Sequence, residues 1–389
     1  MSSRYDFIII GAGITGASTA YHLKKLGMKR VLLFERSKPA AGGTGRSAAV
    51  IRQHYSTALL SLLTKESIGM LSALPDEIGV SGGYVKSGWM FLISADMMEG
   101  ARKNIAMQQG CGINTRFLDD AEIAGHAPWL NPEGVAAVAY EKDGGYADPV
   151  QATEAYVKGF VDLGGEVRTN TPVRELTRDG ERITGVVTDD GPIEADLVVN
   201  AAGPWAKPLA ASANIDMELS VVREQDTVWE ARPNGPVPEV AVSNGVDAIY
   251  VRPLGDRRFV VGRGYPKEYF PVDPYNYKET ADEDFVSDVT TRLEHRFPPM
   301  AGAKLIDSYA ALYDVTPDWY PFIGPRSGLA GYADACGGSG HGFKIGPAIG
   351  RYLARWISDG TVEDDFAKLS YDRLESGWKF VGAYGGNRA

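Results

Sequence analysis

Residues 6–16 read DFIIIGAGITG, and this stretch decides the fold. The apolar run 6–10 has no polar alternation, which is typical of a parallel strand covered on both faces. A glycine-rich turn follows, and small or apolar residues then recur at helical spacing over 17–26. The run 31–35 reads VLLFE and predicts a second buried strand. Strand, helix and strand together take about 30 residues, the size of one parallel βαβ unit.

The turn matches the G-x-G-x-x-G pattern of a dinucleotide-binding unit. Gly11 permits a tight turn, Gly13 lets the backbone approach a pyrophosphate, and Gly16 lets the helix pack closely on the strand. Ile14 and Thr15 open the helix, whose N-terminus presents free N–H groups and the positive end of its dipole to the phosphates. The sequence therefore predicts a dinucleotide site.

The second strand ends on Glu35. Its carboxylate can accept hydrogen bonds from ribose hydroxyls, whereas it would repel a 2′-phosphate, which disfavours NADP. NAD and FAD both remain compatible with this motif, so the rest of the chain has to separate them.

The composition is that of an ordinary folded enzyme. The chain has 389 residues, of which 44% are hydrophobic and 23% charged, and this length favours two lobes. Fifty acidic against forty basic residues give a net charge of −10, which disfavours nucleic acid and anionic membranes as partners. No apolar run approaches the ~20 residues of a membrane span. We therefore expect a cytoplasmic protein with a small-molecule substrate.

The cysteines and histidines exclude two further kinds of site. Cys111 and Cys336 are the only cysteines, so there is no disulfide framework. The five histidines show no metal-ligand spacing, and no metal is expected.

The order of predicted elements divides the chain into two lobes. Alternating strand and helix patterns with glycine-rich turns assign 1–80, 145–215 and 306–389 to a discontinuous dinucleotide-binding domain. The segments 81–144 and 216–305 are richer in strands and proline-rich loops, and we assign them to a substrate-binding domain. The predicted fold class is α/β plus α+β, a Rossmann-like domain with an inserted antiparallel β-sheet domain.

Four further segments resemble the FAD-dependent amine and amino-acid oxidoreductases, a family that includes sarcosine oxidase, glycine oxidase and dimethylglycine dehydrogenase. They read GGTGRSAAVIR at 42–52, ADLVVNAAGPW at 195–205, DWYPFIG at 318–324 and GGSGHGFK at 337–344. The last is similar to the C-terminal signature of sarcosine oxidase. The resemblance extends from residue 6 to about residue 356 and implies that the dinucleotide is FAD.

The resemblance also implies an extended FAD, with adenine near the βαβ unit and the flavin between the lobes. Glu35 is then expected at the ribose, and the backbone of Val173 at the adenine. The other residues expected to contact FAD are Gly11, Gly13, Ile14, Thr15, Gly16, Arg36, Gly43, Thr44, Arg46, Ser47, Ala48, Ala201, Ala202, Gly203, Trp205, Gly337, Gly338, Gly340, His341, Gly342, Phe343 and Lys344. The C-terminal glycine run precedes a helix, and its N–H groups would stabilise the negative charge of reduced flavin.

Two departures from sarcosine oxidase concern the flavin. In sarcosine oxidase a cysteine attaches the flavin covalently, and the matching residue in this chain is Ala311. Because neither cysteine of this chain fits that position, noncovalent FAD is predicted. The oxygen-activating lysine of sarcosine oxidase is matched by Val260, which weakens the preference for an oxidase without reversing it.

The substrate residues also follow from the resemblance. Arg52 and Lys344 match the positions that bind the substrate carboxylate, and an arginine fork with a lysine point charge suits that group. Tyr250 matches a pocket tyrosine, which would bond either the carboxylate or the amine, or else pack in the core. His341 is placed to accept a proton beside the flavin, whereas His54 is expected to be packed or at the surface.

The implied reaction is flavin-dependent oxidation of the C–N bond of a small, N-substituted (secondary or tertiary) amino acid such as sarcosine, dimethylglycine or iminodiacetate. The imine hydrolyses, and O2 is reduced to H2O2. Glycine and proline-like acids are also compatible. The alternative is an FAD dehydrogenase subunit that passes electrons to a partner protein, and a homo-oligomer is equally open. The Tyr- and Pro-rich segment 264–277 is either a lid over the substrate or a self-packed surface loop.

Overall fold

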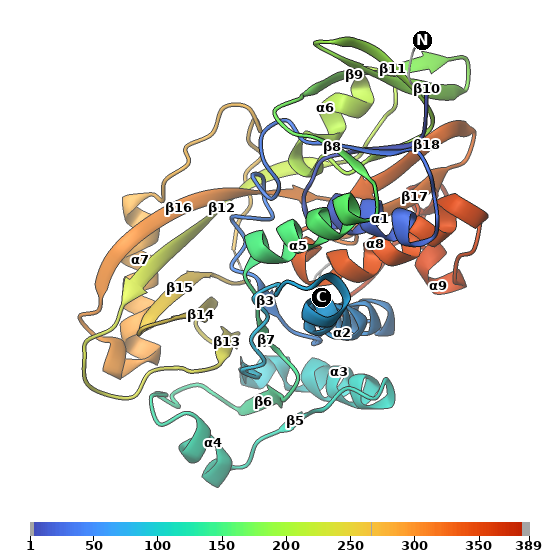
Figure 1. The fold of residues 1–389 in the computed structure, drawn as a ribbon. Helices are drawn as coiled ribbons and strands as arrows, with labels where there is room; N and C mark the ends of the chain where they lie inside the picture. Colours follow the sequence, from blue (N-terminus) through green and yellow to red (C-terminus); the bar gives the residue numbers. More distant parts are fainter. Residues whose placement is uncertain (1–3, 266, 383–389) are drawn as a thin grey trace.

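Two large β-sheets organise the chain in a computed structural model, which describes residues 4–265 and 267–382 (Figure 1). Helices cover the first sheet, and the second sheet extends away from it as a curved layer (Figure 1). Within the described residues, no helix is both long and apolar enough to cross a membrane.

The first sheet contains the predicted βαβ unit. Its parallel part has the order β18-β11-β1-β2-β8, and β9, β10 and β17 join it through antiparallel pairings. The strands are β1 (Tyr5–Ile10), β2 (Val31–Phe34), β8 (Glu166–Arg168), β9 (Val173–Asp179), β10 (Arg182–Thr188), β11 (Gly191–Asn200), β17 (Phe322–Arg326) and β18 (Leu329–Cys336). All residues of β2 and nearly all of β1 are buried, as their unbroken apolar runs require.

Four helices pack beside this sheet: α1 (Ile14–Lys25), α2 (Ala58–Ile78), α5 (Pro149–Asp162) and α8 (Gly342–Asp359). α1 and α8 cross closely because α8 has glycines at the contact. A Cβ atom on Gly346 would lie 2.7 Å from Ile14 Cγ2, and one on Gly350 would overlap with Ser18. The Ser18 hydroxyl donates to the carbonyl oxygen of Pro347 at 2.8 Å. This crossing brings the N-termini of α1 and α8 to neighbouring positions.

The second sheet has the order β16-β12-β15-β14-β13-β4-β6-β5. Its strands are β4 (Trp89–Ile93), β5 (Thr115–Phe117), β6 (Ala137–Glu141), β12 (Ser220–Glu230), β13 (Ala241–Asn244), β14 (Ile249–Gly255), β15 (Arg258–Arg263) and β16 (Lys304–Val315). All neighbours are antiparallel except β13 and β4, which run parallel. α7 (Glu283–Arg296) buries Val289 and Leu293 in the core of this sheet.

The shorter elements complete the path of the chain. They are β3 (Val50–Ile51), β7 (Gly145–Tyr146), η1 (Ala95–Met97), α3 (Met98–Gly110), α4 (Asp120–His126), η2 (Gly203–Trp205), α6 (Ala206–Ala211), η3 (Pro298–Met300), α9 (Asp364–Ala367) and α10 (Asp372–Glu375). β3 and β7 pair with each other where the chain passes between the two large sheets.

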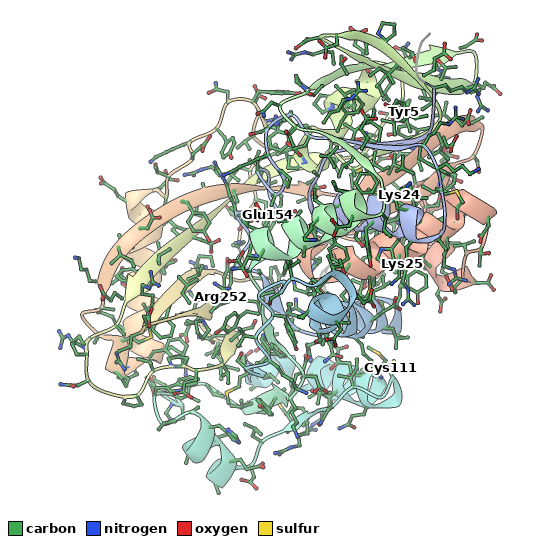
Figure 2. All side chains as sticks on the ribbon, viewed as in Figure 1. Tyr5, Lys24, Lys25, Cys111, Glu154 and Arg252 are labelled. Atoms are coloured by element: carbon green, nitrogen blue, oxygen red, sulfur yellow. The ribbon has the colours of Figure 1, made fainter. Side chains whose placement is uncertain are left out.

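Arg252 ties the two parts together at this passage (Figure 2). It comes from β14 of the second sheet, and its Nη2 donates to the carbonyl oxygen of Ala147 at 2.8 Å. Its guanidinium also lies 4.5 Å from the ring centre of Tyr146 in β7. The junction is therefore held by a buried cation that contacts a backbone oxygen and an aromatic face.

The predicted fold class is confirmed by these two sheets. The assignment of 306–389 to the first lobe meets one difference, because β16 runs to Val315 and pairs with β12 in the second sheet. The domain boundaries themselves stay a prediction.

Candidate active site

A cavity of about 350 Å³ opens at the carboxyl ends of β1, β2 and β11, where dinucleotides bind in open α/β sheets. The turn after β1, the turn after β11 and the N-terminus of α8 all contribute to its wall. Two helix N-termini thus face one cavity, which suits a ligand with negative charge at both places.

The glycines of the first turn shape this cavity. Gly11 has a φ of +105°, and a Cβ atom there would lie 2.5 Å from the carbonyl oxygen of Ala201. A Cβ atom on Gly16 would overlap with the carbonyl of Gly11. The backbone N–H of Ile14 donates to Thr44 Oγ1 at 3.2 Å, so the segment at 42–52 lies against the start of α1. The cradle is open only because these positions have no side chain.

Glu35 is held rigidly at the same cavity. Its Oε2 accepts from the backbone N–H of Ala12 at 3.0 Å, and its Oε1 accepts from the N–H of Ser37 at 3.0 Å. Each oxygen keeps a second lone pair, which is what a ribose diol requires. Beside it, the guanidinium of Arg36 lies 3.6 Å from the ring centre of Trp205.

Most residues predicted to contact FAD line this cavity. They are Gly11, Gly13, Ile14, Thr15, Gly16, Glu35, Arg36, Gly43, Thr44, Ser47, Val173, Ala201, Ala202, Gly203, Trp205, Gly338, Gly340, Gly342 and Phe343. Their individual roles toward FAD stay predictions.

Five residues predicted to contact FAD lie elsewhere. Arg46 donates to the Tyr277 hydroxyl and to the carbonyl oxygen of Ala310, both at 2.9 Å, and pairs with Glu279. The backbone N–H of Gly337 donates to Asp314 Oδ2 at 2.6 Å, so this glycine helps to fix the loop before α8 and does not line the cavity. Ala48, His341 and Lys344 line a second cavity.

The second cavity measures about 260 Å³ and adjoins the first. Ser47, Tyr313, Gly340 and Phe343 line both. The four residues predicted to act on substrate, Arg52, Tyr250, His341 and Lys344, all line it, although 292 positions separate Arg52 from Lys344 in the sequence. The fold therefore brings together every side chain that the sequence proposed for catalysis.

Two of these side chains are basic groups close enough to interact electrostatically, and of the two Lys344 is buried and Arg52 is half-buried. Lys344 is only 8% exposed, and burial, followed by the charge of Arg52, lowers the pKa of its ammonium group well below the ordinary value. Arg52 donates to the carbonyl oxygen of His54, and its guanidinium lies 4.7 Å from the ring centre of Tyr55. Among the described residues, no carboxylate oxygen forms an ion pair with either group, and the carboxyl group whose pKa responds to the charge of Arg52 is that of buried Glu141. An anionic ligand would restore the balance of charge.

The histidines differ in their environments. The Nδ1 of His341 lies 3.3 Å from the Tyr55 hydroxyl. His54 is 2% exposed and packs against the rings of Trp89 and Phe91, and burial lowers its pKa to about 3. His54 is thus a packed, neutral residue, and it also lines the second cavity.

Several lining residues were missed from the sequence: Trp319 lies in the segment 318–324 but was not assigned a role, and no local motif marks the others. Trp89 and Phe91 come from β4, Met97 from η1, and Lys267 and Trp319 from two loops, and these segments meet only in the fold. The segment 264–277 is divided in its placement. Tyr265 and Tyr269 line the second cavity, and the Tyr269 ring lies 5.0 Å from that of Trp319. Phe270 and Tyr275 are largely exposed, and Tyr275 also lies at the wall of the first cavity.

The two departures from sarcosine oxidase lie in the second sheet. Ala311 is buried in β16 and Val260 is buried in β15. Among the described residues, no group of three or more His, Cys, Asp or Glu side chains is arranged to hold a metal ion.

Comparisons with known proteins agree with this geometry. The chain is 28% identical over 375 residues to 4-methylaminobutanoate oxidase (formaldehyde-forming) of Paenarthrobacter nicotinovorans. This match covers 94% of this chain and 45% of that protein. It is 27% identical over 389 residues to mitochondrial sarcosine dehydrogenase of Mus musculus, with 96% and 41% covered. The chain thus spans less than half the length of these two relatives.

The solved structure of L-proline dehydrogenase from P. horikoshii has a TM-score of 0.89 and 26% identity, and the match covers 98% of this chain and 100% of that one. Residues 6–356 match the family described as FAD dependent oxidoreductase. Because this match spans most of the chain and the glycine cradle fits the dinucleotide, the chain belongs to the FAD-dependent oxidoreductase family and has FAD as its cofactor.

Proposed function

We propose that this protein oxidises the C–N bond of a small amino acid whose nitrogen is secondary or tertiary. The observation that carries the proposal is the presence of two basic side chains, half-buried Arg52 and buried Lys344, in a cavity next to the one that fits FAD. Two basic side chains without a direct carboxylate contact, in a small cavity with several aromatic walls, favour a ligand with one carboxylate.

FAD, when bound, supplies the two-electron acceptor for this oxidation, and we propose that it is held noncovalently. Arg52 and Lys344 bind the substrate carboxylate and so fix the direction in which the rest of the molecule points. His341 lines the same cavity and is a candidate to accept a proton. The side chains of Trp89, Phe91 and Met97 form an apolar wall that accommodates an N-alkyl group.

The names of the relatives support a secondary amine. 4-Methylaminobutanoate, sarcosine and L-proline each combine such an amine with a carboxylate. The names divide between oxidase and dehydrogenase. We propose O2 as the electron acceptor, with electron transfer to a partner protein as the alternative.

The test is an anaerobic titration of the FAD-loaded protein with sarcosine, dimethylglycine, iminodiacetate and L-proline. We expect the visible flavin absorbance to bleach with one or more of these acids and to stay unchanged with a simple amine. Admission of air should restore the absorbance within the time of one turnover and produce H2O2. Slow restoration with rapid reduction of an artificial acceptor would establish the dehydrogenase, and no bleaching by any acid would contradict the proposal.

A further inference from the structure

A row of polar side chains crosses four strands of the second sheet behind the substrate cavity. Asp226 of β12 lies opposite Tyr309 of β16 on one side and opposite Gly262 of β15 on the other. Gly262 in turn lies opposite Tyr250 of β14. Residues directly opposite each other in neighbouring strands point to the same face of a sheet, so this row shares one face.

Within this row, the Tyr250 hydroxyl donates a hydrogen bond to Asp226 Oδ1 across the intervening strand β15. The bond passes over Gly262, where a Cβ atom would overlap with both Asp226 Oδ1 and the Tyr250 hydroxyl. Gly262 has no positive φ that would require glycine. The missing side chain therefore leaves room for this particular contact.

Asp226 itself does not face the substrate. It is 5% exposed and is absent from the cavity wall, whereas Tyr250 lines that wall. The titratable groups that face Asp226 are Tyr250, Tyr309, Tyr313, Glu224 and Lys267, and Glu224 and Lys267 pair with each other. Burial raises the pKa of Asp226 to about 7, while the bond from Tyr250 opposes this rise.

The direction of this bond decides what Tyr250 offers to a ligand. A phenol has one proton, and ionised Asp226 receives it, so in that state only the lone pairs of the oxygen remain for the cavity. Arg52 and Lys344 are pure donors and take the carboxylate. Tyr250 is then an acceptor for an N–H group, which resolves whether it meets the carboxylate or the amine.

We propose that Asp226 is a positioning residue that fixes Tyr250 as the hydrogen-bond acceptor for the substrate amine. This inference rests on the proposed function, in which Arg52 and Lys344 bind the carboxylate of the amino acid. It adds that Tyr250 binds the amine of the same molecule. It predicts that the loss of Asp226 weakens the recognition of the amine and spares the recognition of the carboxylate.

The test compares the variant D226N with wild type in the FAD-loaded protein. Sarcosine and L-proline are the amine substrates, and propionate, which has a carboxylate and no nitrogen, is the binding probe followed by the flavin spectrum. We expect kcat/KM of D226N to fall roughly 10- to 100-fold with the amine substrate, because the neutral amide accepts a weaker bond than the carboxylate and can instead turn its NH2 group toward the Tyr250 oxygen. The Kd for propionate should stay within about twofold of wild type.

A double-mutant cycle separates positioning from a general structural effect. If Asp226 acts through Tyr250, D226N should lower kcat/KM less than about twofold further in a Y250F background. The variant E230Q is the control for the loss of a carboxylate from the same strand, because Glu230 is exposed at the far end of β12. It should stay within about threefold of wild type.

Each outcome bears on one statement. Wild-type kcat/KM in D226N, or an equal loss of propionate binding, would overturn the role of Asp226. Should D226N fail to retain FAD, Y250F carries the test, since it should lose the amine substrate by the same factor and keep propionate. No bleaching of the wild type by either amine substrate would remove the proposed function, and this inference with it.

Discussion

The two cavities of this protein lie side by side but are built in different ways. The FAD cavity is made of backbone, with glycine turns and two helix N-termini contributed by short local motifs. The substrate cavity is made of side chains that reach inward from at least four strands and two loops. The first depends on the absence of side chains, and the second depends on their identity.

This difference determines how each cavity responds to change. A methyl group added to the FAD cradle meets backbone atoms that have no room to move. A polar atom removed from the substrate cavity leaves the fold in place and alters only what binds there. Substitutions can therefore separate cofactor binding from substrate recognition.

The largest effect is expected from Gly16→Ala in the cradle. The new Cβ atom would overlap with the carbonyl of Gly11, so α1 must move away from β1. We expect complete loss of bound FAD, measured as flavin absorbance per protein after gel filtration. Gly69→Ala is the control, because Gly69 is exposed in α2 with open space around it, and there alanine should stabilise the helix by up to about 1 kcal/mol. Equal FAD content in both variants would contradict the claim that FAD binding requires the absence of a side chain at Gly16.

The second-largest effect is expected when the binding of the substrate carboxylate is weakened. Arg52→Ala removes the forked donor, and we expect kcat/KM for the amino acid to fall roughly 10²- to 10³-fold while FAD content stays normal. Steady-state kinetics with sarcosine or L-proline measures this. Arg102→Ala, on the exposed face of α3, controls for the loss of one positive charge. If both variants kept wild-type kinetics, Arg52 would have no part in substrate binding.

Glu141 lies behind the substrate cavity and tests stability. It is fully buried, accepts from the N–H of Gln53 at 2.7 Å, and burial raises its pKa to about 7. Its folded pKa exceeds the unfolded one, so the folded state is favoured below about pH 4.5 and loses that advantage as pH rises to 7. Glu141→Gln should therefore gain unfolding free energy over wild type between pH 5 and 8, by about 2 to 3 kcal/mol. Urea unfolding of the FAD-loaded protein measures it, and a gain independent of pH would contradict the assignment.

The smallest effect is a change in a pH profile. Ionised Asp226 accepts a stronger bond from Tyr250 than its protonated form does, and the protonated carboxyl can itself donate to the Tyr250 oxygen, so protonation below pH 7 should lower kcat/KM of wild type. D226N lacks this titration, and the ratio of wild type to D226N should shrink from roughly 10-fold or more at pH 8.5 toward 1 at pH 5.5. A ratio independent of pH would show that Asp226 does not act through its charge.

The same difference explains what the sequence could predict. Gly11 and Gly16 lie within one βαβ unit, so spacing alone indicates their cavity. Arg52 and Lys344 were found only through resemblance, because nothing in their separation indicates proximity. Asp226 was not found at all. Its contact with Tyr250 depends on the register of three strands and on a glycine between them, and register is set by the whole sheet.

The domain limit at 306 differs from the sheet for a related reason. β16 is a long strand that leads back toward the first lobe, and only its pairing with β12 shows that it belongs to the second sheet. Pairing between distant strands leaves no periodic signal at the residue where one lobe ends.

The most direct measurement is an anaerobic titration of FAD-loaded wild type with two pairs of compounds, sarcosine with its carboxamide and L-proline with L-prolinamide. Each pair shares one amine and differs only at the carboxylate. We predict that at least one acid bleaches the flavin absorbance, and that its carboxamide at the same concentration does so at least roughly 100-fold more slowly, because Arg52 and Lys344 have no anion to bind. Bleaching by the carboxamide at the rate of the acid would contradict the account.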